Sequence, residues 1–162
     1  ELARSYLGSA DALVACAVDD RSTLDVHIYA ICFLYRHSFE LLLKDLDWKS
    51  NYAADGNKEY PKNHGLCTRW QDVHERTSKL LGADFPLTTE ATAEVERLFA
   101  SIEEHDPKSD SFRYPFDMRK QRTHPSLTHV NVRALYESTH QVEDYLLALL
   151  EMVADHYNQR SE

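Results

Sequence analysis

The chain has few residues that interrupt helices. Its 162 residues include only 4 Gly and 5 Pro, the two residue types that most often break a helix. Because 43% of the residues are hydrophobic, a chain of this length can bury a core of its own. We therefore expect one domain over residues 1–162, built mainly from long helices.

Signals for export or membrane insertion are also missing. No apolar run has the length of a membrane span, and no secretory signal opens the sequence. Cys16, Cys32 and Cys67 fall at apolar helix positions without metal-binding spacing, so we expect buried thiols in a reducing cytoplasm. The sequence does not begin with Met, and we expect a processed chain or part of a longer protein.

Several common site motifs are absent from the sequence. It has no Gly-rich phosphate loop, no His-x-x-x-His and no Cys-x-x-Cys. Asp117, His124 and His129 are close in sequence, but their spacing is not that of a metal motif. We expect neither a metal nor another cofactor. The net charge of -9 argues against a protein coated with nucleic acid, although a local basic patch remains compatible with it.

Apolar periodicity predicts five helices. We expect them over 2–19, over 25–47 with Asp25 as N-cap, from Leu66 to Gly82, from Thr88 to Asp106, and over 131–156. Residues 49–63 have the composition of a loop. The first helix is expected to bury one face, formed by Leu2, Leu7, Ala10, Leu13, Val14, Ala17 and Val18. These elements predict an all-α, antiparallel four- to five-helix bundle.

The second predicted helix is apolar on most sides, which is typical of a helix at the centre of a bundle. Arg36, His37, Glu40 and Lys44 lie three or four residues apart and form one polar stripe along it. Charges inside a protein need a partner, a site or an interface. One interpretation is a structural network in which Glu40 pairs with Lys44 and anchors Arg113. The other is a binding site.

A long segment, residues 107–130, separates the last two predicted helices. It is about twice the usual length of a bundle connection, and such segments tend to be functional or disordered. It is aromatic at Phe112–Phe116. From Lys108 to His124 it carries five Lys or Arg against two Asp, a charge of +3 that leaves -12 for the rest. We expect an anion site, most simply for phosphate, using Arg113, Lys120 and Arg122. The alternative is a solvated surface loop.

Three motifs resemble those of HEPN-like proteins, a group of bacterial helical-bundle domains. The first is the Arg-His-x-x-Glu-Leu-x-x-Lys pattern of residues 36–44. The second is Asn63-His64-Gly65-Leu66 followed by Trp70, and the third is the Phe-Arg-Tyr-Pro of residues 112–115. They occur in the order found in one uncharacterised branch of that family. The first and last predicted helices match only in length and pattern.

The resemblance implies a helical bundle that is often a homodimer. In catalytic members it implies a metal-independent ribonuclease of toxin–antitoxin, CRISPR-linked or antiphage defence systems, with an Arg/His pair from each protomer. This chemistry is reasonable because RNA supplies its own 2′-hydroxyl nucleophile. The protein then needs a His to move protons and an Arg to stabilise phosphate charge.

Three Arg/His pairs have a spacing that qualifies: Arg69…His74, Arg119…His124 and Arg133…His140. About two such pairs are expected by chance in this composition. Catalytic members place the pair at the start of the last helix, with a polar residue after the Arg. The pair Arg133…His140 has that position, but the residue after Arg133 is Ala134. The pair Arg119…His124 precedes the helix, and the residue after Arg119 is Lys120.

Two hypotheses therefore remain for the function. The first is a non-catalytic HEPN-like module that forms a homodimer or binds a cognate partner protein or RNA, with Arg36, His37 and His64 as binding residues. The polar stripe and final helix would supply its interaction surface. The second is a metal-independent RNA endonuclease that uses Arg119 and His124 or Arg133 and His140. The missing polar residue after Arg133 favours the module, and the basic segment favours the nuclease.

Overall fold

In a computed structural model of the chain, the described residues are 1–20, 23–57, 59–62, 64–107, 109, 111–113 and 130–161. They form α1 (Leu2–Asp19), α2 (Leu24–Asp55), α3 (Leu66–Leu81), the 3₁₀ turn η2 (Gly82–Asp84), α4 (Thr89–His105) and α5 (Val132–Ser161). No strand occurs over these ranges, and the predicted all-α bundle is confirmed. Within the same part of the chain, no helix is long and apolar enough to cross a membrane.

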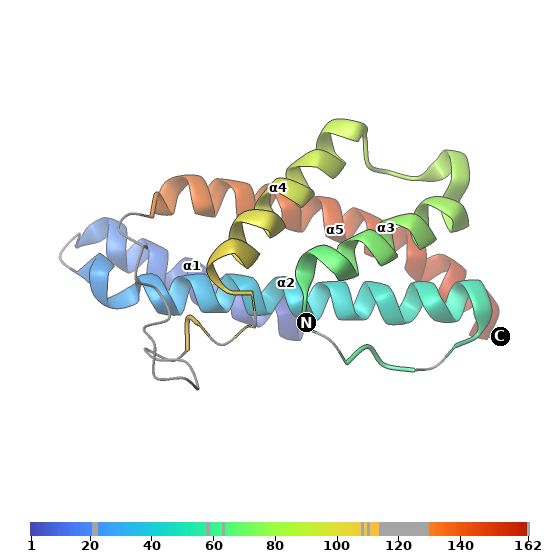
Figure 1. Ribbon diagram of the computed structural model, residues 1–162, viewed down its shortest axis with the longest axis horizontal. Coiled ribbons are helices and arrows are strands. Elements are labelled where there is room, and N and C mark those ends of the chain that lie inside the picture. The colour runs from blue at the N-terminus through green and yellow to red at the C-terminus, as the bar shows by residue number, and fades with distance from the viewer. Residues whose placement is uncertain are drawn as a thin grey trace.

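Helix α2 lies at the centre of the bundle, as its apolar surface predicts (Figure 1). Its first half packs against α1 and the start of α5, and its second half packs against α3, α4 and the rest of α5. The smaller apolar cluster contains Leu7, Ala10, Val14, Ile31 and Tyr35. The larger one includes Phe39, Leu43, Leu46, Trp70, Val73, Val95, Phe99, Leu146 and Leu149.

The helices do not all alternate in direction. Helices α1 and α2 form an antiparallel pair, whereas α2 and α5 run in the same direction (Figure 1). At their C-terminal ends, Arg160 donates hydrogen bonds to the carbonyls of Ala53 and Ala54 at 2.9 and 2.8 Å. The Tyr157 ring lies 5.5 Å from that of Trp48.

Helix α2 continues to Asp55, so the prediction of a loop from residue 49 is wrong for residues 49–55. The polar residues in this stretch are satisfied within the helix. The Asn51 amide donates to the Asp47 carboxylate at 3.0 Å, and the Ser50 hydroxyl donates to the Asp47 carbonyl at 3.2 Å. The helix ends at Gly56, whose φ of 73° is favourable for glycine.

Three smaller expectations are also corrected. Leu2 and Val18 are 62% and 68% exposed, so the buried face of α1 is narrower than expected. Cys16 is exposed rather than buried, because it lies on the outer side of α1. The N-cap of α2 is Thr23 rather than Asp25, which lies in the first turn.

Candidate functional site

The polar stripe of α2 begins at a buried arginine. Arg36 is 0% exposed, and its Nε lies 3.1 Å from the Asp106 carboxylate. Its Nη1 lies 3.2 Å from Glu40 Oε2, and its Nη2 donates to the His64 carbonyl at 3.1 Å. One guanidinium therefore joins α2 to the segment before α3 and the segment after α4. Because its donors are used inside the bundle, Arg36 affects a ligand only through these neighbours.

Glu40 is the second centre of this network. Its carboxylate accepts hydrogen bonds from Lys44 Nζ at 2.7 Å and from the Ser109 hydroxyl at 3.4 Å. His64 Nδ1 lies 2.7 Å from Oε1, and the proton of this contact belongs to the histidine because a carboxylate only accepts. Burial by itself raises the pKa of Glu40, but the hydrogen bonds and charges of Lys44 and His64 outweigh it and lower the pKa to about 2.

Arg113 reaches Glu40 through a third residue. Its guanidinium donates to the Ser109 carbonyl, and the Ser109 hydroxyl donates to Glu40. The Arg113 guanidinium carbon also lies 5.8 Å from the centre of the Phe33 ring, a cation–π distance. The prediction that Glu40 anchors Arg113 thus corresponds to a link through Ser109.

Aromatic side chains continue the stripe toward the start of α2. His37 lies one turn before Glu40, and its ring is nearly parallel to that of Phe33 at 5.6 Å. The Tyr6 ring approaches His37 edge-on at 4.6 Å. All three residues are half-buried. Burial is the main cause that lowers the pKa of His37, so the neutral form of this ring is favoured at pH 7.

These contacts place cationic and aromatic side chains from four segments together. The His64 side chain is 60% exposed and that of Lys44 is 12% exposed, while Arg113 is also exposed. We refer to this surface as the His64 face, and its members are Tyr6, Phe33, His37, Lys44, His64 and Arg113. It brings together four residues that the sequence predicted for binding or for the polar network: His37, Lys44, His64 and Arg113.

The pair Arg133 and His140 has a different environment. Arg133 is exposed and lies 3.2 Å from Glu137 on the same helix. His140 lies between two carboxylates, with Nε2 3.0 Å from Asp11 and Nδ1 3.5 Å from Glu143. Two carboxylates repel an approaching phosphate. The local charge around His140 is therefore unfavourable for RNA.

The structure describes only one of the two remaining Arg/His pairs. Arg119 and His124 lie outside the described residues, as do Lys120 and Arg122, so their proposed roles stay predictions. Arg69 is 2% exposed and lies 2.7 Å from Asp47. His74 lies against the rings of Trp70 and Phe85. Arg69 and His74 thus belong to the packing of α3.

Sequence reasoning missed two members of the buried network. Asp106 is 0% exposed and Ser109 is 5% exposed. The Asp106 side chain also accepts a hydrogen bond from the Ser111 backbone at 2.8 Å, which fixes the turn that leads to Arg113. In the sequence, Asp106-Pro107 indicates only the end of a helix. No pattern in the sequence links Asp106 to Arg36, because the two residues lie 70 positions apart.

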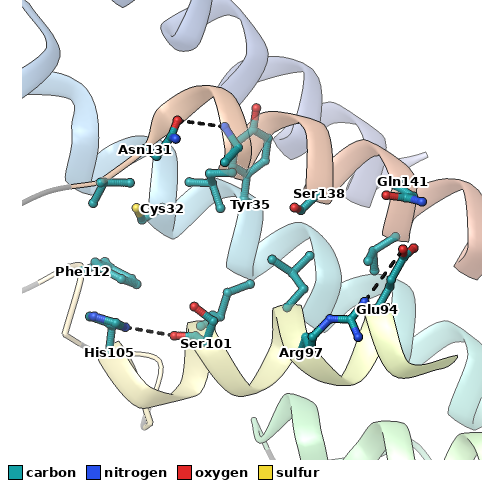
Figure 2. A pocket seen from close by; sticks show the side chains of 16 residues that line it. Cys32, Tyr35, Glu94, Arg97, Ser101, His105, Phe112, Asn131, Ser138 and Gln141 are labelled. Atoms are coloured by element: carbon teal, nitrogen blue, oxygen red, sulfur yellow. Dashed lines mark hydrogen bonds and ion pairs between the residues drawn. The ribbon is translucent and has the colours of Figure 1, made fainter. Parts of the chain in front are cut away.

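A groove between α4 and α5 was not predicted either. It has a volume of about 480 Å³, and Cys32 and Tyr35 of α2 form its floor (Figure 2). Its walls combine apolar side chains with hydroxyl and amide groups. It uses none of the residues of the His64 face.

The fold and these sites define an all-α bundle with a buried ion network beneath a partly exposed cation–aromatic face. No protein-family model, curated protein or solved structure matches the chain. Across the described ranges, no group of three or more His, Cys, Asp or Glu residues could hold a metal ion. The interpretation of the site therefore depends on its own geometry.

Proposed function

We propose that this chain is a HEPN-like module that binds single-stranded RNA through the His64 face, as part of a bacterial defence or toxin-type system. The observation that carries the proposal is the contact set of Glu40. This residue of the first motif contacts His64 of the second, and it reaches Arg113 of the third through Ser109. Segments that resemble the family separately in sequence therefore meet in one network, which supports a shared role.

The composition of the face matches the chemistry of single-stranded RNA. Phosphates require cations, and the exposed Arg113 supplies one. Unpaired bases stack on aromatic rings, and Phe33 and His37 form a stacked, half-buried pair of rings beside Arg113 that a base could extend. The sequence adds Arg119, Lys120 and Arg122 shortly after Arg113, which increases the positive charge available to an RNA backbone.

A metal-independent ribonuclease is the second candidate, and one contact favours it. Glu40 holds the proton of His64 on Nδ1, so a neutral His64 has Nε2 free to accept a proton. A histidine in that state can act as a general base toward a 2′-hydroxyl. Arg133 and His140 fit this role less well, because Asp11 and Glu143 surround His140.

We also propose that the module is a homodimer. Three large apolar side chains are exposed where α1 meets α2: Val18, Val26 and Tyr29 are 68%, 74% and 42% exposed. Exposed apolar side chains near one another are common at protein interfaces. Arg36 and Glu40 do not supply this interface, since both are buried within the protomer. Multi-angle light scattering at micromolar concentration should give twice the chain mass, and a monomer would contradict the proposal.

RNA binding can be tested by fluorescence anisotropy with a labelled single-stranded RNA. We expect Arg113→Gln to weaken binding about tenfold, because a charged contact to phosphate is worth about 1.5 kcal/mol. The slope of log Kd against log salt should fall by about 1. The matched control is Arg133→Gln, an exposed arginine outside the face. Equal binding by the wild type and Arg113→Gln would refute the assignment.

The nuclease is tested by RNA cleavage in EDTA with three variants: His64→Ala, His124→Ala and His140→Ala. Cleavage that survives chelation and disappears only in His64→Ala would assign the general base to the His64 face. Loss in His124→Ala or His140→Ala would instead select one of the Arg/His pairs. Binding without cleavage of structured or single-stranded RNA would leave the non-catalytic module.

A further inference from the structure

The groove between α4 and α5 has the size and form of a small-molecule site. Figure 2 shows α4 along one side, α5 along the other, and Cys32 and Tyr35 of α2 at the bottom. Its volume of about 480 Å³ lies within the range of about 300–1,000 Å³ typical of ligand pockets. The groove is independent of the proposed RNA function, since the two surfaces share no residue.

The groove is bounded at both ends. At one end Gln141 of α5 donates to the Tyr145 hydroxyl at 2.9 Å, and that hydroxyl donates to Glu94 of α4 at 3.0 Å. This chain of hydrogen bonds connects the two helices across the groove. Phe112 lies at the other end (Figure 2), and Val130 also lines the groove. The groove is partly open to solvent, and its bounded length suits a compact molecule better than a helix lying along it.

The described lining residues carry little charge that a ligand could use. At the bottom of the groove, burial raises the pKa of the Cys32 thiol to about 12 and raises the pKa of Tyr35 as well, so both groups are neutral at pH 7. At the rim, Glu94 and Arg97 lie 3.8 Å apart and offset one another, and His105 has its Nδ1 3.0 Å from the Ser101 carbonyl. A charged ligand would lose hydration in this groove without gaining a dedicated partner.

The remaining lining residues indicate which chemical class of ligand fits the groove. Leu98, Ile102, Leu135 and Val142 form apolar walls, and the Ser138 hydroxyl lies at the rim. Apolar walls with a few hydrogen-bonding groups are typical of small-molecule sites. We propose that the groove binds an uncharged, largely apolar small molecule, with its apolar part between α4 and α5 and a polar substituent at the rim.

The test uses N-phenyl-1-naphthylamine, a neutral aromatic dye whose emission rises in apolar surroundings. We expect saturable binding to the intact chain. Ala134→Phe should weaken it about tenfold, a loss of about 1.4 kcal/mol, because Ala134 lines the groove and a phenyl ring would occupy it. Ala148→Phe is the matched control, since Ala148 is also exposed on α5 and lies outside the groove; it should bind the dye like the wild type.

The location of the dye can be checked in the same protein with its own thiols. Saturating dye should slow the alkylation of Cys32, which lines the groove, and leave that of the exposed Cys16 unchanged, as read by peptide mass mapping. Circular dichroism verifies that Ala134→Phe and Ala148→Phe remain folded. Three results would overturn the proposal: no saturable binding, equal binding by Ala134→Phe and the wild type, or no protection of Cys32.

Discussion

The Glu40 carboxylate should contribute several kcal/mol to the stability of the fold at neutral pH. It is 3% exposed and lies at hydrogen-bonding or ion-pair distance from Arg36, Lys44 and His64. Glu40→Gln keeps the size of the side chain and removes its charge. The variant leaves Arg36 with Asp106 as its remaining buried carboxylate partner among the described contacts. We therefore expect a large loss of stability from a change of one atom.

The magnitude follows from the pKa of Glu40. The fold lowers this pKa from an ordinary value of 4.5 to about 2, and each tenfold change in proton affinity corresponds to about 1.4 kcal/mol. The charged form is thus worth about 3 kcal/mol at pH 7. That value agrees with the cost of about 3–5 kcal/mol for removing one partner of a buried ion pair.

The stabilisation by Glu40 should decrease as the pH falls. Because the folded pKa lies below the unfolded one, the stabilisation is complete above about pH 5 and is lost as the pH falls toward 2. The stability difference between the wild type and Glu40→Gln should therefore shrink by about 2 kcal/mol between pH 7 and pH 3. Urea denaturation followed by circular dichroism at both pH values measures it.

The matched control is Glu75→Gln. Glu75 also pairs with a lysine four residues later, at 2.6 Å, but its side chain is 71% exposed. Solvent screens such a pair, so this substitution should change stability little at either pH. A Glu40→Gln protein as stable as the wild type at pH 7, or a difference that does not depend on pH, would refute the reasoning.

Three further predictions concern other parts of the bundle. Asp47→Ala should lower the free energy of unfolding by about 3 kcal/mol or more, because it removes the carboxylate 2.7 Å from the buried Arg69; urea denaturation measures this loss. Glu143→Gln should raise the melting temperature at pH 7 and not at pH 4, because burial raises the pKa of Glu143 and its ionised form is disfavoured in the fold. Iodoacetamide should alkylate Cys16 well before Cys32, whose pKa is about 12, as mass mapping would show.

For each of these three predictions, a specific outcome would contradict the reasoning. Asp45→Ala is the control for Asp47, since Asp45 forms only a partly exposed pair with Lys49 at 2.8 Å; equal losses from the two variants would contradict the buried-pair argument. A Glu143→Gln protein that melts lower than the wild type at pH 7 would reverse the assigned sign. Equal alkylation rates for the two thiols would contradict the described environments.

Apolar spacing was sufficient to predict the helices and the central position of α2. Phe39, Leu43 and Leu46 are all buried at 0% exposure, as a helix with neighbours on most sides requires. The end of α2 was harder to locate. Asn51 usually favours a turn, but here its amide donates to Asp47 one turn earlier, so local composition gave the wrong boundary.

Only part of the network below the His64 face could be predicted from the sequence. The i,i+4 spacing of Arg36, Glu40 and Lys44 predicts their ion pairs, and these pairs are observed. The contacts of Arg36 with Asp106 and with the His64 carbonyl connect residues 70 and 28 positions apart. Spacing along one helix contains no information about such contacts. The groove depends likewise on how α4 and α5 diverge over α2, which no local pattern specifies.

The location of RNA on the protein is the most direct test of the central claim. We would photo-crosslink a single-stranded RNA containing 4-thiouridine to the intact chain and map the attachment sites by mass spectrometry. The proposal predicts crosslinks in the peptides that carry His37, His64 and Arg113. Crosslinks confined to the peptide with Arg133 and His140, or no crosslink to the His64 face, would contradict it.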